Sequence, residues 1–231
     1  MKVDKYIGHS GFLSRGKAYD LIAKKKITVN GKLATYSTQI KEGDVILVDG
    51  VDIRTGVFVP TYIMYNKPKG IECTSEKIAG NIIDAVGHPR KIHPVGRLDK
   101  DSEGLILLTD HKEIIDKIAN PKYDHEKEYV VTLNLPVRKQ FLEEISAGIE
   151  LDGKKTKPCK ATLEPGTKRV FRIILTQGLN RQIRRMCNSY GYQVVKLQRV
   201  RIMNISLGKL PSGQWRDLSE GELNELLPAL S

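Results

Sequence analysis

From residue 62 to the end of the chain, short β-prone segments alternate with segments of helical periodicity. The predicted strands are 62–67, 104–109, 128–135, 170–177 and 193–206, and the predicted helices are 111–119, 138–146 and 180–191. Ser219 and Glu222 form a capping box for one further helix. Because strands outnumber helices and several connections have hairpin length, residues 62–231 predict an α+β domain on a mixed, mainly antiparallel sheet.

The first 49 residues predict a separate, small α/β module. Two short helices are indicated, the second with Ser14 as its N-cap. An Asn-Gly pair between β-forming residues follows and is a strong hairpin signal, and GDVILVD supplies a closing strand. Residues 50–61, rich in Gly, Thr and Pro around short β-prone pieces, are interpreted as a linker between the two domains.

Positive charge narrows the class of partner. The formal net charge of +11 favours a polyanion, first of all a nucleic acid, although a basic surface without such a role is the alternative. The first 49 residues carry nine Lys and Arg against five Asp and Glu. Most of these basic residues lie on the second helix and around the turn, where we expect them to contact phosphates: Arg15, Lys17, Lys24, Lys25, Lys26 and Lys32.

A second basic stretch, residues 168–201, carries nine Lys and Arg and no Asp or Glu. Within it, Arg181, Arg184 and Arg185 open a predicted helix, where their charges oppose the helix macrodipole. This arrangement favours an anion at that helix end. The alternative is that an arginine here, Arg184 above all, pairs with a distant carboxylate.

Several classes of protein are disfavoured. No run approaches the roughly 18 apolar residues of a membrane span, and the N-terminus lacks the apolar core of a secretory signal. Cys73, Cys159 and Cys187 are far apart without a CxxC pair, which is typical of reduced thiols, and the five histidines are scattered. We therefore expect a cytoplasmic protein without a membrane segment or a metal site.

The stretch GRLDKDSEGLILLTD, residues 96–110, places Asp99 among Arg97 and Lys100, just before an apolar run. The usual role of such an Asp is to cap its own backbone in a turn. If it is catalytic, it would be an ionised nucleophile. Glycosidic chemistry usually needs a second carboxylate, and three are near but none obviously poised: Asp101, Glu103 and Asp110. Without a Walker loop or a GxGxxG motif, a cofactor-free reaction of one acid on nucleic acid remains.

This stretch closely resembles the signature of the RsuA-like ribosomal pseudouridine synthases, which isomerise uridine within rRNA. Companion motifs lie in the family's order at 65–70 (YNKPKG), 125–133 (HEKEYVVTL) and 177–187 (QGLNRQIRRMC). The first 49 residues resemble an S4-type RNA-binding module, although Gly16 stands where a second consecutive basic residue is common. Within the branch, the motifs are most similar to the large-subunit (23S) synthases of the F type.

The resemblance implies that Asp99 is the catalytic aspartate. It would act at the ribose, at C1′ or on the 2′ proton, while uracil leaves through N1 and rejoins through C5. No cofactor is implied, and the uridine must be flipped out of its helix to reach the pocket. Arg184 is expected to pair with Asp99, and Arg97 to bind the flipped nucleotide.

The other implied roles concern the base and the surrounding RNA. Tyr129 is expected to stack on the base and could assist proton removal at C5, while Leu197 packs on the other side. Lys67 is also expected to bind the substrate, and Arg181 and Arg185 are expected to contact the RNA. The implied partner is ribosomal RNA, free or in an assembling particle, and the chain is expected to be a monomer. The alternatives are a non-catalytic S4-type ribosome factor and a synthase acting on 16S rRNA or tRNA.

Overall fold

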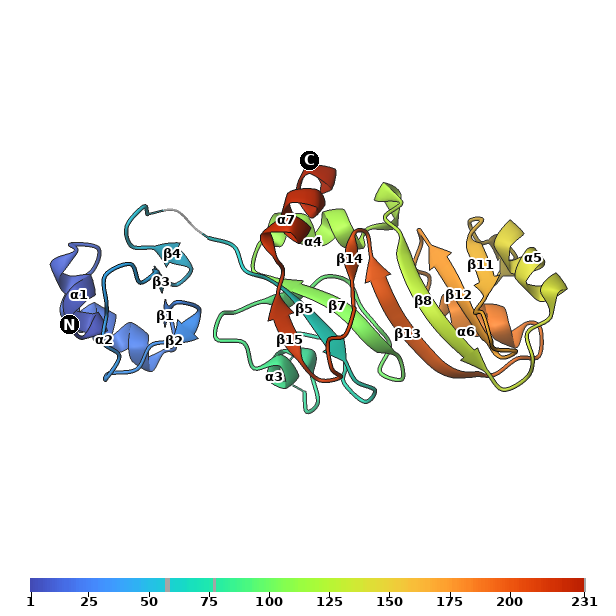
Figure 1. Cartoon of the computed structure of the whole chain (residues 1–231), viewed down its shortest axis with the longest axis horizontal. Coiled ribbons are helices and arrows are strands. Elements are labelled where there is room, and N and C mark those ends of the chain that lie inside the picture. Colours follow the sequence, from blue (N-terminus) through green and yellow to red (C-terminus); the bar gives the residue numbers. More distant parts are fainter. Residues whose placement is uncertain (57–58, 77, 231) are drawn as a thin grey trace. The chain divides into compact units, whose positions relative to one another are not determined.

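The computed structural model describes residues 1–56, 59–76 and 78–230. Its contacts divide the chain into two units (Figure 1): Met1–Thr61 with Gly87–Ile92, and Tyr62–Val86 with His93–Ser231. Both units mix helices with sheets, as the sequence predicts.

The N-terminal unit begins with α1 (Val3–His9) and α2 (Arg15–Ala23). Ser14 caps α2 as predicted, because its Oγ accepts a hydrogen bond from the Lys17 amide at 3.3 Å. The four short strands that follow form an antiparallel sheet in the order β2-β1-β3-β4: β1 (Ile27–Val29), β2 (Lys32–Leu33), β3 (Ile46–Val48) and β4 (Val51–Asp52).

Local sequence signals explain this small sheet. Asn30 and Gly31, between β1 and β2, have φ angles of 49° and 76°, the left-handed conformation of a tight hairpin turn. Apolar side chains of both helices and the strands bury one core. β4 falls within the stretch 50–61 that the sequence indicates as linker, so the first residues of that stretch belong to the sheet.

A nine-stranded sheet forms the second unit. Its main path runs β11-β12-β8-β13-β7-β5-β15, while β14 pairs with β13 and β6 with β7. All of these pairs are antiparallel except β13 with β7, which confirms the predicted mixed sheet. The strands are β5 (Tyr62–Lys67), β6 (His93–Pro94), β7 (Glu103–Thr109), β8 (Lys127–Leu133), β11 (Lys160–Leu163), β12 (Val170–Leu175), β13 (Val194–Ile202), β14 (Ile205–Ser206) and β15 (Trp215–Asp217). A separate hairpin pairs β9 (Glu150–Leu151) with β10 (Lys154–Lys155).

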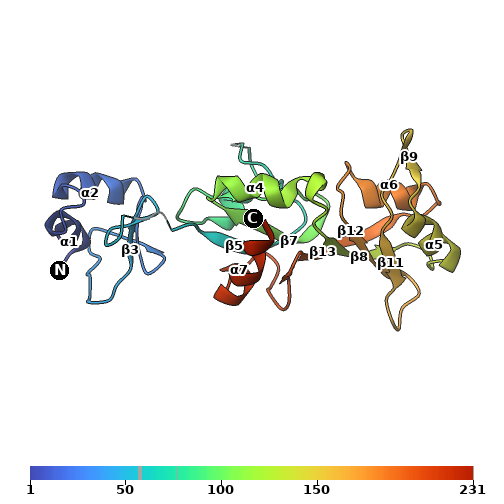
Figure 2. The same cartoon turned by 90° about the horizontal axis from the view of Figure 1, so that it is seen from above.

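Helices pack at both ends of this sheet. The second unit contains α3 (Ile82–Val86), α4 (Lys112–Ala119), η1 (Pro121–Tyr123), α5 (Lys139–Ala147), α6 (Gln182–Asn188), α7 (Glu220–Leu226) and η2 (Pro228–Leu230). Figures 1 and 2 show α4 and α7 beside β5 and β7, and α5 and α6 beside β11 and β12. The predicted capping box is present, with both Ser219–Glu222 hydrogen bonds formed. Within the described ranges, no helix is long and apolar enough to cross a membrane.

The two ends of the sheet have separate cores that meet where β13 runs parallel to β7. One core gathers Val131, Phe141 and Phe171, and the other Met64 and Leu107. At their junction Arg199 lies opposite a glycine, Gly104. A Cβ on Gly104 would lie 2.3 Å from the Arg199 carbonyl oxygen, and its φ of 104° is unfavourable for other residues. A glycine is therefore required where the loop bearing Asp99 enters β7.

Candidate active site

The backbone around Asp99 is held by hydrogen bonds from several directions. Asp99 lies between β6 and β7, and its carbonyl accepts from the Ser102 amide at 3.0 Å. The Leu98 amide donates to Cys73 Sγ at 3.3 Å, and the Lys100 carbonyl accepts from the Gly70 amide at 2.8 Å. The Asp99 side chain remains 34% exposed. A fixed backbone with an accessible carboxylate suits a group that must meet a substrate in one geometry.

Arg199 supports this loop from inside the sheet. It is only 3% exposed, and its Nε donates to the Leu105 carbonyl at 2.7 Å. Its Nη1 donates to the Arg97 carbonyl at 3.4 Å. The sequence did not identify Arg199 as part of the site, because one basic residue in a strand ordinarily faces solvent.

A cavity of about 320 Å³ opens beside Asp99. Tyr129 from β8, Leu197 from β13 and Leu175 from β12 line it, together with Arg97. These three strands are neighbours in the sheet (Figure 1), so residues far apart in sequence meet at one place. The turn 177–183, which leads into α6, supplies the remaining wall with Leu98 and Ser102. The structure thus brings together Asp99, Tyr129, Leu197 and Arg97, as the sequence predicts.

Arg181 is the arginine nearest the Asp99 carboxylate. Its Nη1 lies 3.7 Å from Asp99 Oδ2. The same guanidinium binds Asp101 in a bidentate manner, with Nη1–Oδ1 and Nη2–Oδ2 distances of 3.0 and 2.9 Å. Arg181 hydrogen bonding, followed by the charge of Arg184, holds the pKa of Asp101 below its ordinary value. Asp101, which the sequence indicates only as one of three nearby carboxylates, therefore holds the cation beside Asp99.

The prediction that Arg184 pairs with Asp99 is wrong. Arg184 donates to the backbone carbonyl of Asp101 at 3.0 Å and to Ser102 Oγ at 3.4 Å, while its Nη1 donates to the Val194 carbonyl at 3.2 Å. Its Nε lies 3.3 Å from Asp101 Oδ2, and the side chain is only 12% exposed. Arg184 therefore acts on the backbone of the turn, whereas Arg181 faces the carboxylate. Arg181 is the N-cap of α6 and has a φ of 47°, in the left-handed region.

Lys67 does not line the cavity, which contradicts its expected role in substrate binding. It is fully buried at the end of β5, and its Nζ donates to the carbonyls of Pro68 and Ile71, both at 2.9 Å. Burial lowers its pKa. Lys67 instead shapes the loop whose Gly70 amide binds the Lys100 carbonyl, so it supports Asp99 through the backbone.

A second hollow, of about 470 Å³, shares Arg97, Leu98, Asp99 and Arg181 with the first. Its other lining residues are Lys69, Gly70, Glu72, Cys73, Lys100 and Asp101. Lys69 and Lys100 are exposed. Asp99 therefore stands between a cavity with apolar walls and a more basic hollow, which is an arrangement suited to a base and to the phosphates that flank it.

Comparison with known proteins identifies the family. A family model described as RNA pseudouridylate synthase matches residues 61–189, and an S4 domain model matches residues 1–46. The chain belongs to the RNA pseudouridine synthases. It is 47% identical to the dual-specificity RNA pseudouridine synthase RluF of Escherichia coli K12, over 98% of this chain and 78% of that protein. The ribosomal large subunit pseudouridine synthase B of Bacillus subtilis is 34% identical, over 97% and 95% of the two chains.

A solved structure supports the same family assignment. The crystal structure of a pseudouridylate synthase matches 98% of this chain and 99% of its own, with 31% identity and a TM-score of 0.68. The fold of this pseudouridine synthase and its N-terminal S4 domain are thus those that the sequence predicts, and its partner is RNA.

The residues predicted to contact RNA elsewhere on this synthase have differing surroundings. Lys17, Lys24, Lys25 and Lys32 are exposed on the N-terminal unit, whereas Arg15 pairs with the buried Asp4 at 2.7 Å. Arg185 pairs with Asp152 and donates to the Asn180 carbonyl at 3.3 Å. RNA contact by these residues remains a prediction.

Proposed function

We propose that this protein isomerises a specific uridine of ribosomal RNA to pseudouridine, most directly in the large-subunit RNA, and that Asp99 is its catalytic aspartate. The observation that carries the proposal is the meeting of Asp99, Tyr129 and Leu197 around one cavity at the centre of the sheet. The large-subunit enzyme named for B. subtilis supports the substrate, since it matches nearly the whole chain.

In this proposal the reaction needs no cofactor and no second acid. The Asp99 carboxylate attacks C1′ or removes the 2′ proton of the flipped-out nucleotide, and the N1–C1′ bond breaks. Uracil, retained in the cavity, turns and forms the C5–C1′ bond. As it does so, the Asp99–C1′ bond breaks or, on the second route, Asp99 returns the proton to C2′. The proton that C5 loses is balanced by the proton that N1 gains. The product is an isomer, so water need not enter. Tyr129 stacks on uracil and its hydroxyl assists the transfer of the C5 proton, which N1 finally carries, while Leu197 packs against the other side.

Several groups position the aspartate. Arg181 places a cation 3.7 Å from the carboxylate and is itself held by Asp101. Arg184 and Lys67 act on the backbone of the loops around it. Arg97, exposed at both hollows, binds the nucleotide, and Lys69 and Lys100 contact the flanking phosphates.

The parts of the chain have separate tasks. Residues 1–49 form an RNA-binding module, 50–61 a linker that includes β4, and 62–231 the catalytic domain. The exposed lysines of the module hold the RNA that surrounds the target, together with Arg181 at the N-cap of α6 and Arg185 within α6. The enzyme acts in the cytoplasm as a monomer.

Mapping pseudouridines in RNA from cells with and without this gene tests the function. Because the E. coli relative is named a dual-specificity synthase, the map should cover tRNA as well as both ribosomal RNAs. We expect a large-subunit site that disappears with the gene and returns with the wild-type gene but not with Asp99→Asn. A site confined to 16S rRNA or tRNA would replace the proposed substrate. No lost site would favour a non-catalytic RNA-binding factor.

A further inference from the structure

Two tyrosines stack on each other at the surface of the N-terminal unit. The ring centroids of Tyr19, in α2, and Tyr36, in the turn after β2, are 4.2 Å apart, with an interplanar angle of 26°. The two residues nevertheless remain 51% and 42% exposed. A stacked pair of aromatic rings that is half open to solvent offers a flat apolar surface for a further ring.

Both rings are attached to rigid parts of the unit. Tyr19 follows the fully buried Ala18 on α2, so that its helix is fixed to the core. The turn that carries Tyr36 is closed by the Thr35 amide donating to Thr38 Oγ1 at 2.8 Å and by the Thr38 amide donating to the Thr35 carbonyl at 3.1 Å. The Thr38 carbonyl in turn accepts from the Val3 amide at 3.1 Å. A ligand would therefore meet a stack that is already formed, which reduces the entropy lost on binding.

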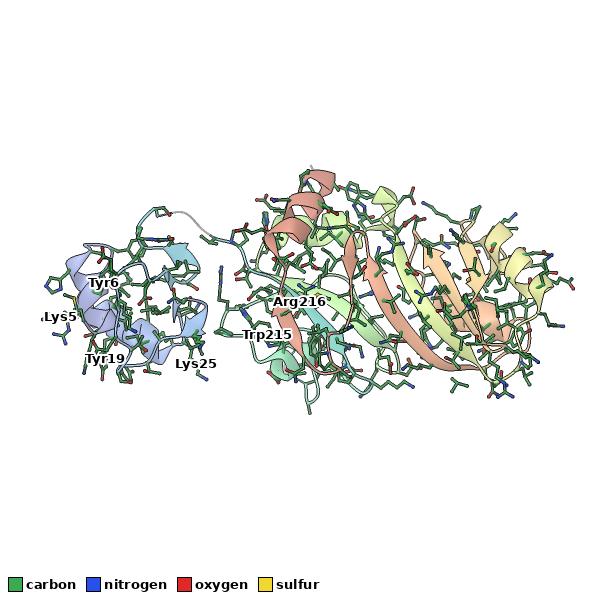
Figure 3. The ribbon with its side chains drawn as sticks, in the orientation of Figure 1. Lys5, Tyr6, Tyr19, Lys25, Trp215 and Arg216 are labelled. Carbon is green, nitrogen blue, oxygen red and sulfur yellow. The ribbon has the colours of Figure 1, made fainter. Side chains whose placement is uncertain are left out.

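Cations lie close to the tyrosines along the chain. Lys24 and Lys25 directly follow α2, and Lys32 begins the strand that leads to Tyr36; all three are exposed. Figure 3 places Tyr19 and Lys25 along the same edge of this unit. Within the described residues these three lysines form no ion pair, whereas Lys26 binds Asp49 at 2.6 Å. Aromatic rings among unpaired cations favour a ligand that has both planar bases and phosphates.

We propose that Tyr19 and Tyr36 are a stacking platform for an unpaired base of the RNA, with Lys24 and Lys25 binding the adjacent phosphates. The inference rests on the proposed function only in taking RNA as the ligand. It commits to a single-stranded segment, because bases within a duplex are already stacked and present no free face. The S4 module would then distinguish unpaired from paired RNA next to the site of modification, rather than act through charge alone.

The test compares full-length wild-type protein with a Tyr19→Leu/Tyr36→Leu variant and a Tyr19→Phe/Tyr36→Phe variant. Leucine keeps an apolar side chain without an aromatic face, and phenylalanine keeps the stack. The probes are a short oligoadenylate, the same backbone with abasic residues, and an RNA duplex. We expect the leucine variant to bind oligoadenylate about tenfold more weakly and the phenylalanine variant to bind it like the wild type. The abasic strand and the duplex should bind all three proteins equally.

Two results would overturn the platform. Unchanged affinity of the leucine variant for oligoadenylate would show that the tyrosines do not bind an RNA base, and that they contact either a protein partner or no partner. If the leucine variant also bound the abasic strand more weakly, to the same degree, the substitutions would be disturbing phosphate binding. Single leucine variants whose thermal unfolding is unchanged would distinguish that effect from misfolding. Isomerisation is not the readout, so failure of the platform and failure of the proposed reaction are distinguishable.

Discussion

Arg181 Nη1 lies 3.7 Å from Asp99 Oδ2, while the same guanidinium makes two hydrogen bonds to Asp101 at 3.0 and 2.9 Å. One arginine thus bridges the proposed catalytic carboxylate and a second carboxylate two residues later. Asp101 holds Arg181 in place and leaves Asp99 the longer and weaker contact. The first three predictions follow from these different roles of Asp99 and Asp101.

Replacing Asp99 with asparagine should abolish isomerisation and leave folding and RNA affinity nearly unchanged. Asparagine is close in size but has no anionic oxygen to act at the ribose. The measurement is pseudouridine formation on a ribosomal RNA fragment, with thermal unfolding and RNA binding as controls. Substantial turnover by a folded Asp99→Asn protein would exclude the mechanism.

Replacing Asp101 with asparagine should release Arg181 from its ionic contact and lower kcat by about tenfold, with a smaller effect on RNA affinity. The depressed pKa of Asp101 means that the ion pair is complete above the ordinary Asp pKa of 3.8 and weakens as pH falls through the lower folded-state value. A kcat equal to that of the wild type would show that Asp101 does not position the cation. Asp152→Asn, at another exposed Asp–Arg pair, is the matched control.

Arg184→Met should lower both stability and kcat, because it removes the donors for the carbonyls of Asp101 and Val194. A decrease of about 2 kcal/mol in the free energy of unfolding is expected from the loss of hydrogen bonds whose donor carries a charge. Arg181→Met, at a more exposed guanidinium, should lower kcat with little change in stability. Chemical denaturation and single-turnover rates distinguish the two. The opposite pattern would restore Arg184 as the direct partner of Asp99.

Gly104→Ala should destabilise the protein by more than about 2 kcal/mol, since the new Cβ would lie 2.3 Å from the Arg199 carbonyl in a left-handed backbone. Gly221→Ala, in α7 with open space around it, should be neutral or slightly stabilising. Urea unfolding of both variants measures the difference. Equal stabilities would mean that β7 and β13 can separate without cost at this position.

Lys24→Gln with Lys25→Gln should make RNA binding less salt-dependent. For every phosphate that the protein no longer neutralises, the slope of log affinity against log salt should become shallower by about 0.7 to 0.9. Lys154→Gln with Lys155→Gln removes the same charge from the exposed hairpin strand β10 and serves as the control. Because Gly16 stands where a second basic residue is common, we expect the Lys24→Gln/Lys25→Gln variant to show only a modest decrease in RNA affinity. Identical slopes for the two variants would argue against phosphate contact by the N-terminal module.

Elements whose causes are local could be predicted from the order of the residues alone. Ser14 caps α2, the Asn30–Gly31 pair closes a hairpin and Ser219 with Glu222 caps α7. Each of these depends on the side chains and dihedral angles of residues within one turn of backbone. The ordered motifs around Asp99 and Tyr129 likewise identified the family and the centre of the cavity, because chemistry restricts which residue types can stand there.

The cation that meets Asp99 and the direction in which Lys67 points depend instead on the folded arrangement of distant segments. Arg181 and Asp101 are 80 residues apart, and their pairing depends on strand order, on the parallel β13–β7 register and on the left-handed backbone of Arg181. Arg199 directs its charge inward to the carbonyl of Leu105, 94 residues away in the chain. Lys67 binds the nearby carbonyls of Pro68 and Ile71, but it is buried because β5 pairs with β7 at Gly104. The acceptor of Arg199 reaches it only after distant segments have met, and the burial of Lys67 likewise depends on neighbouring strands, so no local pattern of residues could reveal either.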